Sequence, residues 1–155
     1  MYYDHSNGNR CHPLCRVDDN TLALFENQYP VQPMGVSYNS YVILDEKIAV
    51  MDSVDARAAE EWLSNVAQVL EGRNPDYLVV THMEPDHSGS LMRLAQKYPE
   101  MKIVGNAKTF TLIKQFFGTG ALSEDVCWRL AKEIRFPWAC TGCAFCWRRW
   151  YTGRR

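Results

Sequence analysis

The chain has 155 residues, enough for one domain with a buried core. Its 46% hydrophobic and 23% charged residues are ordinary for a globular protein, and its net charge of −1 argues against the basic excess of a nucleic-acid-binding protein. No apolar run is long enough to cross a bilayer, and the N-terminus lacks the apolar stretch of a secretory signal. We therefore expect a cytoplasmic protein with neither nucleic acid nor membrane as a partner.

The chain becomes regular at Val17, and its next part predicts strands followed by a helix. Segments rich in β-branched and aromatic residues predict strands. The polar turn at 45–47 makes the second and third strands a hairpin. Ser53 or Asp55 can cap the helix, whose apolar residues recur at the 3.6-residue period. The expected strands cover 21–26, 36–44 and 48–52, and the expected helix covers 58–70.

Strands and helices alternate in the rest of the middle part. Short apolar strands are predicted at 77–80 and 102–105, and helices at 89–98 and 107–118, the last one ending at a glycine. Strands that alternate with helices predict an α/β layer architecture.

The segment THMEPDHSGS, residues 81–90, follows the strand predicted at 77–80. Ligand sites of α/β folds commonly lie in such loops at the carboxyl ends of strands. In an extended segment, His82, Glu84 and Asp86 would point to one side, while His87 could turn toward a second centre. Gly89 would let the backbone bend close to the site. Two imidazoles and two carboxylates form a natural donor set for metal ions, so we predict a metal site.

A less specific interpretation treats the same segment as a solvated loop. Ser88 or Asp86 would then be the N-cap of the following helix, and the histidines would have no role. Four donor side chains within six residues, placed between a buried strand and a helix, make the metal site the better interpretation.

The pattern H-x-E-x-D-H resembles the H-x-H-x-D-H signature of the metallo-β-lactamase superfamily. Glu84 stands where the hydrolases of that superfamily carry a histidine, and a carboxylate favours iron over zinc. The pattern is similar to that of the flavodiiron proteins, and the segments LFENQYPV, GVSYNSYVILDEK and DSVD agree with this family. The resemblance covers about residues 17–126.

The resemblance implies a metallo-β-lactamase-like αβ/βα sandwich, of which residues 17–126 would supply the first half. It implies a di-iron centre, with His82 and Glu84 at one iron and Asp86 and His87 at the other. It also implies FMN, in a flavodoxin-like domain, and a rubredoxin-like or similar electron donor. Full-length members commonly form head-to-tail homodimers. Neither the later metal ligands of the family nor its flavin domain is found in the sequence.

The implied activity is the reduction of oxygen to water or of nitric oxide to nitrous oxide, in a chain that we expect to be inactive alone. One alternative is a zinc hydrolase of the same superfamily, in which metal-bound hydroxide attacks an ester or thioester; Glu84 argues against it. A second alternative is a non-catalytic di-iron module that senses oxygen or binds a partner.

The six cysteines lie only in the two ends of the chain, and most tryptophans lie in the last part. Cys140, Cys143 and Cys146 form a C-x2-C-x2-C pattern that lacks the fourth ligand of a zinc or iron–sulfur site. A shift of the reading frame permits family-like sequence at both ends. We therefore interpret residues 1–16 and 127–155 as out-of-frame translation and 17–126 as the lactamase-like part.

Overall fold

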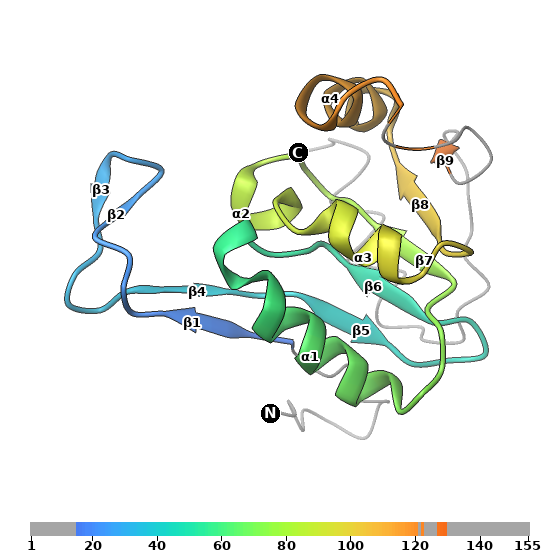
Figure 1. The fold of residues 1–155 in the computed structure, drawn as a ribbon, viewed down its shortest axis with the longest axis horizontal. Coiled ribbons are helices and arrows are strands. Elements are labelled where there is room, and N and C mark those ends of the chain that lie inside the picture. Colours follow the sequence, from blue (N-terminus) through green and yellow to red (C-terminus); the bar gives the residue numbers. More distant parts are fainter. Residues whose placement is uncertain (1–14, 121, 123–126, 130–155) are drawn as a thin grey trace, which may run out of the picture.

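A five-stranded sheet forms the centre of the protein (Figure 1). The computed structural model describes residues 15–120, residue 122 and the backbone of residues 127–129. The sheet order is β5-β6-β7-β8-β9, in which β5 is antiparallel to β6 and the other neighbours are parallel. The strands are β5 (Tyr41–Ile43), β6 (Ala49–Met51), β7 (Tyr77–Val79), β8 (Lys102–Gly105) and β9 (Cys127–Arg129).

Helices connect the parallel strands, as the alternating pattern predicts. The 3-10 turn η1 (Ala56–Ala58) leads into α1 (Ala59–Leu70), and the Asp55 side chain caps this start by accepting a hydrogen bond from the backbone N–H of Arg57. The remaining helices are α2 (Pro85–Ser88), α3 (Leu91–Lys97) and α4 (Ala107–Phe117). Helices α1 and α3 lie on one face of the sheet (Figure 1).

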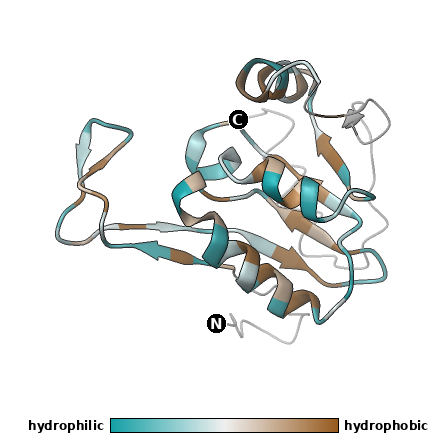
Figure 2. Ribbon diagram, in the orientation of Figure 1, coloured by the Kyte–Doolittle hydropathy of each residue, from teal (hydrophilic) through white to brown (hydrophobic). Residues whose placement is uncertain are grey.

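The main core lies between this sheet face and the helices. Val42, Val50, Leu78 and Ile103 are paired in register across four strands and are fully buried, with the buried ring of Trp62 from α1 in the same cluster. Because successive strand residues point to opposite faces, one row of side chains builds one core. Figure 2 shows the corresponding hydrophobic colour on β6 and β8.

The opposite sheet face carries a smaller apolar cluster of Ile43, Ala49, Val79 and Val104. Half of a two-sheet sandwich would by itself leave this sheet face in water, yet all four of these residues are buried and at most 5% exposed. The first sheet with its helices agrees with the expected α/β fold.

The expected domain boundaries remain predictions. Cys15 belongs to the segment that we interpret as out of frame, and it is buried in the main core.

A two-stranded ribbon and a hairpin project from the sheet at its β5 side (Figure 1). The ribbon pairs β1 (Val17–Asp19) with β4 (Val36–Tyr38), and the hairpin pairs β2 (Leu24–Phe25) with β3 (Tyr29–Pro30). The strand expected at 36–44 is therefore two strands, because β4 pairs with β1 whereas β5 pairs with β6.

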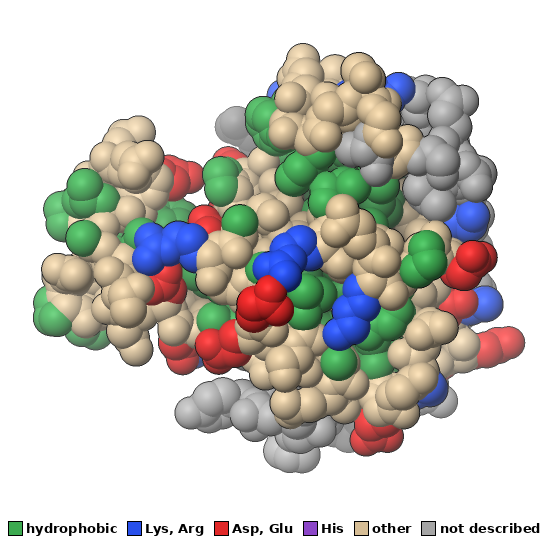
Figure 3. All heavy atoms as spheres, viewed as in Figure 1, with side chains coloured by type: hydrophobic (Ala, Val, Ile, Leu, Met, Phe, Trp, Pro, Cys, Tyr) green, Lys and Arg blue, Asp and Glu red, His purple; other side chains and the backbone are tan. Residues whose placement is uncertain are grey.

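The surface shows charged side chains of both signs without a single basic patch on the face seen in Figure 3. Within the part of the chain that the structure describes, no helix has the length and apolar character needed to span a membrane.

A candidate metal centre at the carboxyl ends of the strands

The candidate site lies where the parallel strands β6 and β7 end. Asp52 directly follows β6, and Thr81 and His82 follow β7. Since parallel neighbours bring their carboxyl ends to the same sheet edge, the two loops meet there. This position confirms that the THMEPDHSGS segment starts just beyond the end of a strand.

Asp52 turns the chain sharply after β6. Its backbone is left-handed, with φ of 56°, a conformation that aspartate tolerates better than most residues. Its N–H donates to the carbonyl of Val79 at 2.8 Å, and its carbonyl accepts a bond from the Ser40 hydroxyl at 3.1 Å. The turn places the Asp52 side chain, which is only 10% exposed, beside the next loop.

The Asp52 carboxylate holds two residues of the candidate loop. It accepts hydrogen bonds from the backbone N–H of Thr81 at 2.7 Å and from the Thr81 hydroxyl at 2.5 Å. Its Oδ2 lies 3.1 Å from Nδ1 of His87. This hydrogen bond raises the pKa of His87 above its usual value, although burial of the ring opposes the rise. The His87 ring is therefore half-buried and held in place by Asp52. It does not fit the interpretation of the segment as a solvated loop whose histidines have no role.

The second part of the loop is helical, which changes how its ligand candidates are presented. Glu84 is extended, with φ of −67° and ψ of 147°, but Pro85 opens the helical turn α2 that contains Asp86 and His87. Proline favours the first position of a helix because its φ is already helical. The prediction that His82, Glu84 and Asp86 alternate along one extended segment is therefore wrong for Asp86.

The four candidate residues nevertheless come together as two pairs. Nδ1 of His82 lies 3.4 Å from Oε2 of Glu84, and Nε2 of His87 lies 3.4 Å from Oδ2 of Asp86. The two imidazole rings join the pairs, with their centroids 4.0 Å apart. Each pair contains one imidazole and one carboxylate.

The pairs differ in their exposure to solvent. The Glu84 side chain is 65% exposed, whereas the side chain of Asp86 is 21% exposed. Oδ1 of Asp86 is buried and has no hydrogen-bond partner among the residues that the structure describes. A buried carboxylate oxygen without a donor is costly unless a cation or water satisfies it.

The residues fit a metal centre in their chemistry, although the described side chains do not complete one. Carboxylate and imidazole groups suit iron, and the unsatisfied Asp86 oxygen is an available donor. Among the described residues, no group of three His, Cys, Asp or Glu side chains is placed to hold a metal ion. The arrangement is two pairs of candidate ligands, which would need further donors to hold a metal ion.

Backbone hydrogen bonds fix the loop to the rest of the sheet edge. The His87 carbonyl accepts bonds from the Ser53 N–H at 2.8 Å and the Ser53 hydroxyl at 3.0 Å. The Ser88 hydroxyl donates to the carbonyls of Met83 and Glu84, so Ser88 is no N-cap of the following helix. The residue before α2 is Glu84, and the one before α3 is Ser90, which excludes capping by Asp86 as well.

Gly89 has a different role from the expected one. Its backbone is right-handed helical, with φ of −59°, so no special bend requires glycine. A Cβ atom here would lie 2.7 Å from both Ala56 N and Pro85 O. Glycine is needed because the end of α2 packs directly against the start of η1.

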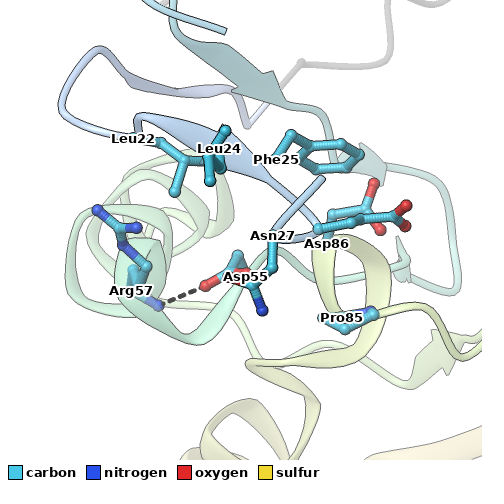
Figure 4. Close-up of a pocket in the computed structure, with 9 residues that line it drawn as sticks. Leu22, Leu24, Phe25, Asn27, Asp55, Arg57, Pro85 and Asp86 are labelled. Carbon is cyan, nitrogen blue, oxygen red and sulfur yellow. Dashed lines mark hydrogen bonds between the residues drawn. The ribbon is translucent and has the colours of Figure 1, made fainter. Parts of the chain in front are cut away.

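A cleft of about 220 Å³ adjoins the loop, with Asp86 in its wall (Figure 4). Leu22, Leu24 and Phe25 give it an apolar side, and Asp55 and Arg57 give it a charged side. The remaining lining residues are Glu26, Asn27, Pro85 and Asp86. No sequence signal connects the hairpin residues with this cleft, because only the tertiary fold brings them beside α2.

Sequence analysis also missed Asp52 as a partner of the loop. Asp52 is the last residue of the strand predicted at 48–52, and a carboxylate at the end of a strand was a usable signal. The cysteines at 140, 143 and 146 lie outside the described residues.

The sequence matches the family described as the metallo-beta-lactamase superfamily over residues 34–133. The structure resembles the flavodiiron protein from Giardia intestinalis with a TM-score of 0.72 and 26% identity, covering 88% of this chain and 32% of that chain. The chain belongs to the flavodiiron branch of the metallo-β-lactamase superfamily. It corresponds to the N-terminal, lactamase-like domain of the flavodiiron family.

Two curated relatives show the range of names in this flavodiiron family. The rubredoxin-oxygen oxidoreductase of Megalodesulfovibrio gigas is 40% identical over 75 residues, which are 48% of this chain and 19% of the relative. The anaerobic nitric oxide reductase flavorubredoxin of Vibrio vulnificus is 39% identical over 69 residues, 44% of this chain and 14% of the relative. The match thus spans less than a fifth of the length of either relative. Flavodiiron homologues carry a di-iron centre and FMN.

Proposed function

We propose that this chain supplies the first ligand loop of a flavodiiron oxidoreductase that reduces oxygen to water, nitric oxide to nitrous oxide, or both. The observation that carries the proposal is the pairing of His82 with Glu84 and of Asp86 with His87, joined by the two rings 4.0 Å apart. Two imidazole–carboxylate pairs side by side suit two metal ions better than one.

In the proposed centre, His82 and Glu84 hold one iron and Asp86 and His87 hold the other. The irons, when bound, supply a binding place for the diatomic substrate and the change of redox state. The chain's own residues hold and orient the donors. Asp52 fixes the His87 ring, and Ser53 fixes the His87 backbone. We assign no side chain of the loop as a proton donor or acceptor in the reaction.

The rest of the proposed activity needs parts beyond this chain's described residues. Electrons would come through FMN from a rubredoxin-like donor, and the working enzyme would be a homodimer. The names of the two relatives contain rubredoxin and flavorubredoxin and support the choice of donor. We propose that the chain alone binds metal weakly and has no turnover.

Metal binding by the purified full chain tests the ligand assignment. We expect iron(II) to bind under anaerobic conditions and to be lost when His82→Gln, Glu84→Gln, Asp86→Asn and His87→Gln are combined. The matched control is Glu46→Gln, which removes a carboxylate in the β5–β6 turn, at the other end of the strands from the candidate loop. Equal iron binding by the wild type and the fourfold variant would contradict the assignment.

The same titration, followed by an assay of ester and thioester hydrolysis, tests the hydrolase alternative. Zinc binding with ester or thioester hydrolysis would favour the hydrolase. Glu84, which pairs with His82 in the structure, is the residue that argues for iron.

A further inference from the structure

The two oxygens of the Asp52 carboxylate have different partners. Oδ1 accepts the backbone N–H of Thr81 at 2.7 Å. Oδ2 accepts the Thr81 hydroxyl at 2.5 Å and faces Nδ1 of His87 at 3.1 Å. An ionised carboxylate can only accept hydrogen bonds, so the proton of the His87 contact lies on Nδ1.

The other nitrogen of His87 points toward the neighbouring ligand candidate. Nε2 lies 3.4 Å from Oδ2 of Asp86. A neutral imidazole protonated on Nδ1 keeps a lone pair on Nε2 and can bind a metal ion there. The hydrogen bond on one side of the ring thereby decides which atom is available on the other side.

We propose that Asp52 is a positioning residue that holds His87 in the Nδ1–H tautomer and makes Nε2 the metal-binding atom of this ring. The metal part of this inference rests on the proposed function. The tautomer part rests only on the contacts of Asp52 and can be tested without metal.

Hydrogen bonds to neighbouring residues fix the position of Asp52. Its left-handed backbone is hydrogen-bonded to Val79 on one side and to Ser40 on the other. The His87 carbonyl is held by two bonds from Ser53. Both ends of the Asp52–His87 contact are therefore fixed by backbone interactions that do not involve a metal.

Asp52→Asn gives a sharp test because the structure predicts the orientation of the new amide. The Thr81 N–H still needs an acceptor, so the asparagine oxygen takes the Oδ1 position and the NH2 group takes the Oδ2 position. That NH2 group can only donate to Nδ1 of His87. We expect the substitution to move the ring proton from Nδ1 to Nε2.

Nitrogen NMR of the 15N-histidine-labelled full chain, at alkaline pH and without metal, measures the tautomer. His87→Gln identifies the signals of this ring. The matched control is Asp76→Asn, because the Asp76 carboxylate also accepts a backbone N–H bond, from Ile48, while its other oxygen accepts a bond from Lys47 instead of facing a histidine. The control should leave the His87 signals unchanged.

Iron(II) affinity gives the second measurement. We expect it to fall by about 10- to 100-fold in Asp52→Asn, as for other partners of metal-binding histidines, and to stay constant in Asp76→Asn. An Nε2–H tautomer in the wild type would overturn the role of Asp52, as would an unchanged tautomer in a folded Asp52→Asn variant. If that variant does not fold, the wild-type spectrum alone decides. A wild-type chain with the expected tautomer but no metal binding would contradict the proposed function instead.

Discussion

Replacing Gly89 with alanine would place a methyl group 2.7 Å from two backbone atoms, Ala56 N and Pro85 O. Neither atom belongs to a flexible side chain, so the start of η1 would have to move away and the α2 turn itself would have to change shape. Such overpacking costs about 2–3 kcal/mol of unfolding free energy. Because Gly89 is already helical, alanine would return about 1 kcal/mol through its better helix propensity.

The net expectation is a loss of about 1–2 kcal/mol, equivalent to a melting temperature about 5–10 °C lower for a domain of this size. Urea unfolding of the full chain, followed by circular dichroism, measures the change. Gly120→Ala is the matched control, since no atom of the described residues, apart from its neighbours in the chain, lies within 4 Å of its added Cβ. An unfolding free energy for Gly89→Ala within about 0.5 kcal/mol of the wild type would refute the steric argument, because surface substitutions give changes of that size.

Three further predictions follow from other parts of the chain. Burial alone would raise the pKa of Asp76, but hydrogen bonds from Lys47 and from the Ile48 N–H outweigh it and lower this pKa below 3.8. Its carboxylate therefore stabilises the fold above pH 3.8, and the stability difference between the wild type and Asp76→Asn in urea unfolding should shrink as pH falls through the lowered pKa; a difference independent of pH would contradict this. Glu84→His should raise the ratio of zinc to iron affinity, measured by competitive loading and metal analysis, and an unchanged ratio would remove Glu84 as the determinant. The nucleotide sequence around codons 10–17 and 125–130 should permit family-like alternative frames, and codons that forbid them would end the frameshift hypothesis.

The sequence predicted the local helices and strands better than it predicted how the strands pair. The helix at 58–70 and the strands at 77–80 and 102–105 were close to α1, β7 and β8, because apolar periodicity and capping are local signals. The division of 36–44 into β4 and β5 was not predictable, because it depends on pairing with β1 and β6, which are distant in sequence.

The candidate site shows the same division. The four donors and their position after a strand were evident from THMEPDHSGS, and the structure places them in two pairs. The helical turn at Asp86 was missed, although Pro85 was a local signal for it. Asp52 could not be joined to His87 by spacing alone, since the two residues meet only when β6 and β7 lie side by side.

The attachment of the loop to the sheet edge has a thermodynamic consequence. The bonds from Ser53 to the His87 carbonyl and from the Thr81 N–H to the Asp52 carboxylate exist only while β6 and β7 are paired. A metal ion held by the proposed pairs would therefore bind the native chain in preference to the unfolded one. By mass action, free metal at 100 times its dissociation constant would add about 2.7 kcal/mol to the stability of the native state. The native fraction of the chain, and with it resistance to proteolysis, would then rise and fall with the iron supply.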